Sequence, residues 1–183
     1  MADRTKTYIL ADWKSDKDAV DQLFNWNSDA HWNLELEYTC SDRWRSQKFC
    51  HTKLWDIKTK LDISKTFVLI IGENTKDFFQ YRGKCHLCSG YPDWALDCIY
   101  GAGKLDFRNF LDYACEEAVQ AGLKIVVLYK ATTVDKTRCP EAVKDIGTHA
   151  AMFFGTDEEP LWDYESVKNA LEIVDSDLLS FDI

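Results

Sequence analysis

Two carboxylate residues directly follow apolar runs of the sequence, and they are the first candidates for chemistry. Asp12 ends the run 8–11, and Glu73 follows the run 67–72. A carboxylate at the end of a buried strand can stabilise positive charge or transfer a proton. Asp12, with Asp16 close by, could instead only cap a helix or hydrogen-bond loop backbone, because aspartate favours such positions. Both interpretations stay open.

The neighbours of these carboxylates could shape a ligand site. A tryptophan beside a strand, such as Trp13, could stack on a base or ring, although it packs in a core as often. In an open α/β sheet, ligands bind beyond the carboxyl ends of the strands. We therefore predict a polar, acidic and partly aromatic site there, formed by Asp12, Trp13, Asp16, Gly72, Glu73 and Asn74.

The cysteines offer a second kind of chemistry. The chain has seven, and Cys85-x-x-Cys88 and Cys98 lie in one glycine-rich segment. These three could hold a structural zinc ion if a fourth ligand came from elsewhere. The candidates for that ligand are His86, Cys50, His51, Cys139 and His149. Buried or free thiols are the alternative, and Cys115, on the apolar face of a predicted helix, is expected to be a core residue.

The common phosphate-binding and catalytic motifs are missing. The sequence has no Walker motif, no G-x-G-x-x-G after a strand and no G-x-S-x-G. An ATPase, a dinucleotide-dependent dehydrogenase and a hydrolase with a nucleophile elbow are therefore not supported.

Charge and hydropathy limit the partners. A formal net charge of −9 disfavours nucleic acid, whose binding depends on basic surface. No apolar run approaches the roughly 18 residues of a membrane helix, and the first residues lack the apolar core of a signal peptide. We expect a cytoplasmic protein without a membrane partner.

Alternating strand and helix patterns predict the fold. Five apolar or alternating runs are typical of strands, at 8–11, 34–38, 67–72, 124–129 and 150–154. Helical patterns separate or follow them, beginning at Ser15, near Leu54, at Asp106, at Pro140 and at Asp163. This order predicts an α/β domain with a doubly wound, mostly parallel five-stranded sheet and helices on both faces.

The length of 183 residues and a hydrophobic content of 46% suit one domain over 1–183. The segment of about 74–106 breaks the pattern with glycines, cysteines and aromatic residues, so we expect an insertion that is functional or held by a metal. The tail after 175 is expected to be frayed.

Three stretches together resemble the TIR-like domains of bacterial antiviral defence of the Thoeris type. They are 8–18, 65–75 and 107–129, in matching order within a likeness that spans roughly 8–155. The resemblance implies a flavodoxin-like fold and an enzyme that cleaves the nicotinamide–ribose bond of its substrate NAD. It also implies an ADP-ribose-derived product, often cyclic, that acts on a downstream effector. Aromatic side chains, where exposed, could form a homo-oligomer.

The same family places a glutamate in the helix after the third strand. It follows an aromatic residue, with a small residue four positions on and a glycine closing the helix. Tyr113, Ala118 and Gly122 meet that spacing, so the matching position is Ala114, and Tyr113 becomes a candidate substrate contact. A carboxylate close to the ribose would stabilise the oxocarbenium character of the transition state.

Three explanations of Ala114 stay open. They are an engineered Glu-to-Ala substitution, a register error with Glu116 or Glu117 as the carboxylate, and an ordinary core alanine in an inactive domain. Two other functions also stay open. One is a non-catalytic TIR-like interaction module, and the other is a nucleoside deoxyribosyltransferase-like enzyme, which uses a glutamate nucleophile.

Overall fold

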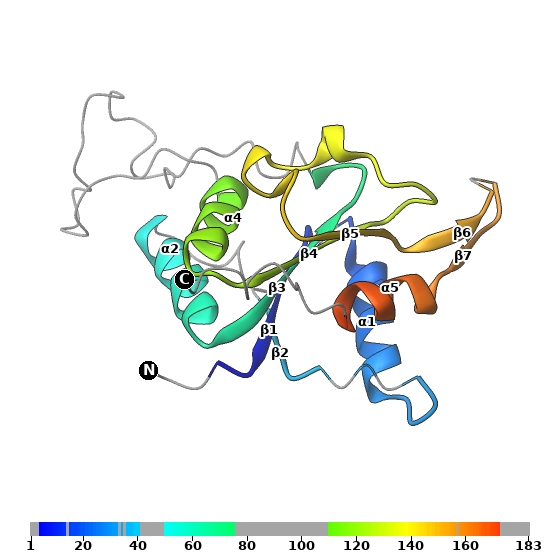
Figure 1. Ribbon diagram of the computed structural model, residues 1–183, viewed down its shortest axis with the longest axis horizontal. Helices are drawn as coiled ribbons and strands as arrows, with labels where there is room; N and C mark the ends of the chain where they lie inside the picture. The colour runs from blue at the N-terminus through cyan, green and yellow to red at the C-terminus, as the bar shows by residue number, and fades with distance from the viewer. Residues whose placement is uncertain are drawn as a thin grey trace, which may run out of the picture.

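A parallel five-stranded sheet forms the centre of the computed structural model, which describes residues 4–13, 15–32, 34, 36–40, 50–75, 110–156 and 158–172 (Figure 1). Its strands are β1 (Lys6–Leu10), β2 (Tyr38–Cys40), β3 (Ser64–Ile71), β4 (Lys124–Tyr129) and β5 (Thr148–Ala151). Their order is β2-β1-β3-β4-β5, and every neighbouring pair is parallel. The predicted doubly wound α/β fold is confirmed.

Helices cover both faces of this sheet. They are α1 (Lys17–Ser28), α2 (Cys50–Asp62), α4 (Phe110–Gln120) and α5 (Tyr164–Glu172). Figure 1 shows α2 and α4 on one side of the sheet and α1 and α5 on the other. Within the described ranges, no helix combines the length and the apolar composition needed to cross a membrane.

The side chains of the strands alternate between two hydrophobic clusters. Phe67 and Leu69 pack on the α2/α4 side, whereas Val68 and Ile70 pack on the α1/α5 side. Both sets are fully buried, as expected of a central strand that is apolar at every residue. This alternation determines which face of the sheet the side chain at each strand end points to.

The predicted strand 34–38 is wrong in its bounds, since β2 begins only at Tyr38. The side chain of Asn27 explains the difference. Its Nδ2 donates to the Leu36 carbonyl at 3.0 Å, and its Oδ1 accepts from the Leu36 amide at 2.6 Å. Asn27 thus takes the two backbone groups that a strand partner would otherwise pair.

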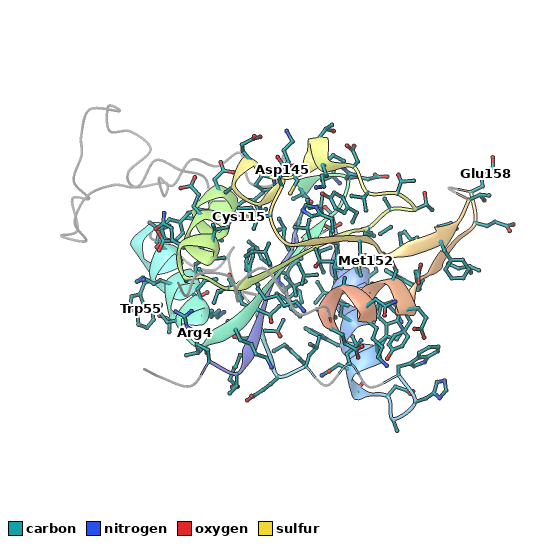
Figure 2. The ribbon with its side chains drawn as sticks, viewed as in Figure 1. Arg4, Trp55, Cys115, Asp145, Met152 and Glu158 are labelled. Carbon is teal, nitrogen blue, oxygen red and sulfur yellow. The ribbon has the colours of Figure 1, made fainter. Side chains whose placement is uncertain are left out.

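The region after β4 also differs from the predicted elements. The helix expected from Pro140 is only a short 3₁₀ turn, η2 (Glu141–Val143), preceded by another, η1 (Lys136–Arg138). The predicted strand 150–154 is divided: β5 ends at Ala151, and the hairpin β6 (Phe153–Gly155) and β7 (Pro160–Trp162) follows. Met152 lies at this break, and Glu158 lies at the hairpin's far tip (Figure 2).

Candidate functional site

The strand order places a switch point between β1 and β3. After β1 the chain forms α1 on one face of the sheet and then β2. After β3 the next described helix is α4, on the other face, and it is followed by β4. Strands β2 and β4 therefore flank the β1/β3 pair on opposite sides. The loops after β1 and β3 therefore diverge, which opens a crevice at the carboxyl edge of the sheet. The predicted residues Asp12 to Asp16 and Gly72 to Asn74 follow these two strands.

The turn after β1 is held together by Asp12, which is buried. Its carbonyl accepts hydrogen bonds from the amides of Ser15 at 3.1 Å and Asp16 at 2.7 Å. Its Oδ2 also accepts from the Ser15 hydroxyl at 2.8 Å. These contacts support the loop-holding interpretation of Asp12.

Asp16 is the most enclosed carboxylate of the site, with 1% of its surface exposed. It occupies the N-cap position of α1 without making a side-chain capping bond, so Ser15 does not open the helix as predicted. A Cβ added to Gly72 would lie 1.8 Å from Asp16 Oδ1. Glycine at position 72 is therefore what lets the carboxyl group reach the end of β3.

Two cations complete this cluster. Lys130 follows β4, and its Nζ lies 3.9 Å from Asp16 Oδ1 and 2.6 Å from Asp18 Oδ1. The same ammonium donates to the Ser15 carbonyl at 2.9 Å. Arg138, at the end of η1, donates to the Gly72 carbonyl. Both cations thus brace the loops that hold Asp16.

The surroundings of Asp16 raise the pKa of its carboxyl group toward neutral pH. Burial raises its pKa from the ordinary 3.8 to about 6, Lys130 opposes that shift, and Asp12 and Asp18 add to it. Its Oδ2 is buried and has no hydrogen-bond partner among the described residues. A carboxyl group that titrates near neutrality and keeps one oxygen uncommitted can exchange a proton or accept a ligand hydroxyl.

The remaining residues predicted at the carboxyl edge of the sheet are more exposed than Asp16, or pack against other side chains. Glu73 and Asn74 are exposed just beyond β3. Trp13 is half-buried, and its ring centroid lies 6.4 Å from that of Phe24 against the α1/α5 cluster. The packing interpretation of Trp13 gains support from that contact.

Ala114 and Tyr113 lie elsewhere. Ala114 on α4 is fully buried, and both residues belong to the hydrophobic cluster between α4 and the sheet. Asp16 lies at the N-cap position of α1, which covers the face of the sheet opposite to α4 (Figure 1). The structure therefore does not bring position 114 together with the Asp16 cluster, and Glu116 and Glu117 on the same helix are half-buried.

The proposed zinc ligands Cys85, Cys88 and Cys98 lie outside the described residues. Among the residues that are described, no three His, Cys, Asp or Glu side chains gather as a metal site would require. Cys115 is buried on α4 (Figure 2), as predicted for a core residue. Cys139 is likewise buried, and burial raises the pKa of both thiols.

The nitrogens of His149 are both engaged in hydrogen bonds. Its Nε2 lies 3.1 Å from the Val143 carbonyl, and its Nδ1 lies 2.9 Å from the Tyr129 hydroxyl. Because a carbonyl only accepts, Nε2 carries the proton and Nδ1 accepts from Tyr129. Burial lowers the pKa of the His149 imidazole, which keeps it neutral. His149 is thus a half-buried histidine with both ring nitrogens occupied, rather than an open metal ligand.

Neither Lys130 nor Arg138 was predicted from the sequence to have a role in the site. Lys130 directly follows the strongly apolar run 124–129, so the sequence does place it at the ligand edge. Arg138 carries no such signal, since it reaches the site from a 3₁₀ turn that the sequence pattern does not reveal.

The fold and these residues define a doubly wound α/β domain with an acidic, cation-braced site at its switch point. A comparison of the sequence with protein-family models matches none, and a comparison with curated proteins also matches none.

Proposed function

We propose that this chain is a TIR-like enzyme that cleaves the bond between nicotinamide and ribose in NAD, using the switch point between β1 and β3. The observation that carries the proposal is Asp16, a buried carboxyl group at the expected ligand edge with a pKa of about 6. Its Oδ2 has no hydrogen-bond partner among the residues that the structure describes. Such a group can accept a hydrogen bond from a ribose hydroxyl, or a proton from an attacking one.

The charge of the site favours the nicotinamide end of the substrate. The charged groups that act on Asp16 are the carboxyl groups of Asp12 and Asp18 and the cations of Lys130 and Arg138, so carboxyl groups, Asp16 included, outnumber cations by one. An acidic site repels phosphates and attracts the cationic nicotinamide ring. As the bond breaks, positive charge moves onto the ribose, where nearby carboxylates stabilise it.

The atoms of the proposed reaction balance without a further cofactor. The bond between C1′ and the nicotinamide nitrogen breaks, and its electron pair leaves with neutral nicotinamide. Water, or a hydroxyl or ring nitrogen of the same molecule, attacks C1′ and gives ADP-ribose or a cyclic form. One proton is released, and in this proposal ionised Asp16 accepts it.

The burial of Ala114 supports its interpretation as a core residue, and the proposal assigns the carboxylate chemistry of this chain to Asp16. A role of the product as a signal to an effector in antiphage defence rests on the family resemblance alone.

The test is nicotinamide release from NAD with mass analysis of the products. Asp16→Asn should lower the rate by roughly 100-fold, the usual scale for losing an acid–base group. The matched control Asp21→Asn changes an exposed carboxylate on α1 that pairs with Lys17, and it should leave the rate unchanged. Undiminished release by Asp16→Asn would remove Asp16 from the chemistry. NAD binding without turnover in any variant would favour an interaction module.

A further inference from the structure

A cavity of about 330 Å³ opens at the opposite edge of the sheet from the candidate site. It lies at the amino ends of β1 and β3, the lower edge in Figure 1. Ligands of this fold class are expected at the carboxyl edge. A cavity at the amino edge is therefore a separate feature, independent of the proposed function.

The floor of the cavity is polar. Thr7 and Thr66 face each other as register partners across β1 and β3. By the alternation of each strand they lie on the same side as Ile9 and Val68, which is the α1/α5 side. Both threonines are buried and line the cavity.

Three leucines form the apolar part of the lining, and the backbone of two of them is held in place. They are Leu34, Leu36 and Leu171, and all three are half-buried. Asn27 fixes the backbone of Leu36 through the two hydrogen bonds described above, and the carbonyl of Leu171 accepts a bond from Lys124. Because these bonds join different elements of the fold, the cavity is preformed, which limits the cost of binding.

The rim carries two charges of each sign, from Lys65, Lys168, Glu37 and Glu172. Glu37 is already paired with Lys6, at 2.8 Å. Lys168 and Glu172, one turn apart on α5, line the cavity with their nitrogen and oxygen 3.8 Å apart. Their side chains are 36% and 63% exposed, and such a pair contributes little to stability. Glu172 can turn to a ligand at small cost, whereas Lys168 also lies over the ring of Tyr164, with its Nζ 5.7 Å from the ring centroid.

We propose that this cavity binds a free amino acid with an apolar side chain. The ammonium of the ligand would pair with Glu172 and its carboxylate with Lys168, while its side chain rests on the three leucines. A volume of about 330 Å³ lies near the lower end of the range for small-molecule pockets, which suits a ligand of this size.

The experiment titrates the full chain with leucine and follows the backbone amide signals by NMR. Two probes each lack one charge: 4-methylpentanoate has no ammonium, and 3-methylbutylamine has no carboxylate. Leucine should give saturable shifts at Thr7 and Thr66, and each truncated probe should bind roughly tenfold more weakly, as expected for losing one charged contact.

Two variants test the rim directly. Lys168→Gln and Glu172→Gln should each weaken leucine binding by a similar factor. The control Lys58→Gln breaks an equally spaced ion pair with Asp62 on α2, at 3.7 Å, and should change nothing. The proposal fails if leucine produces no saturable shift at the threonines. It also fails if 4-methylpentanoate binds as tightly as leucine, or if the rim variants bind like the control.

Discussion

The carboxyl group of Asp16 lies directly against Cα of Gly72, where any side chain would collide with it. Asp16 comes from the start of α1 and Gly72 from the end of β3, so their contact joins the two segments that border the switch point. The position of the candidate carboxylate thus depends on the absence of one methyl group.

This contact predicts a strong coupling between the two positions. Gly72→Ala should lower the free energy of unfolding by about 2 kcal/mol, because the methyl group overpacks the site. The three atoms nearest to that methyl all belong to the Asp16 carboxyl group, and Asp16→Ala removes them. In the Asp16→Ala background, Gly72→Ala should therefore cost almost nothing. Urea denaturation of the four proteins measures the coupling, and additive effects would contradict the contact.

The raised pKa of Asp16 predicts how stability depends on pH. The folded protein holds this proton more tightly than the unfolded chain between pH 3.8 and about 6. The contribution of Asp16 to stability is thus complete below pH 3.8 and is lost as pH rises to about 6, for a total of about 3 kcal/mol.

Replacing Asp16 by asparagine should remove that loss. Asp16→Asn is expected to be more stable than the native chain at pH 7, and the gain should shrink as pH falls through the same window. Urea denaturation across this pH range measures it, with Asp21→Asn as the exposed control. A constant difference between Asp16→Asn and the native chain at every pH would mean that Asp16 titrates normally.

Lys130 is predicted to lower the pKa of Asp16, against the effect of burial. Its ammonium favours the ionised carboxylate, so Lys130→Met should raise the pKa of Asp16 further above about 6. The pH optimum of nicotinamide release, if Asp16 is the base, should move up with it. NMR titration of the carboxyl carbon measures the shift. Lys17→Met changes an exposed lysine of α1 and serves as the control; it should leave the pKa of Asp16 unchanged.

The parts of the fold that the sequence predicts well are those where one local pattern suffices. The runs 67–72 and 124–129 are apolar at every residue and form the central strands β3 and β4. Asp163 was expected to cap the last helix, and its Oδ1 accepts from the Ser166 amide at 2.9 Å.

The differences arise where a distant side chain competes with the local pattern. Asn27 removes Leu36 from the predicted second strand although the alternation of that segment is regular. The same limit applies to the site. Sequence alone places Asp16 and Gly72 after their strands, but their contact and the approach of Arg138 depend on how separate loops meet.

The burial of Ala114 predicts the effect of placing at this position the glutamate that the resemblance to TIR-like domains implies. Ala114→Glu places a carboxylate in the hydrophobic cluster between α4 and the sheet, where no surface is exposed. The substitution should lower the free energy of unfolding by roughly 3 kcal/mol or more at neutral pH, through overpacking and burial of a charge. The loss should be smaller in acid, where the new carboxyl group is protonated.

Gln120→Glu is the matched control, because it introduces the same side chain at an exposed position of α4 and should change stability by less than about 0.5 kcal/mol. Urea denaturation and nicotinamide release are measured on both variants. A stable Ala114→Glu protein that gains NAD cleavage would show that position 114 opens to the substrate, and would move the reacting carboxylate from Asp16 to α4. Loss of stability without gain of activity would establish the alanine as a core residue.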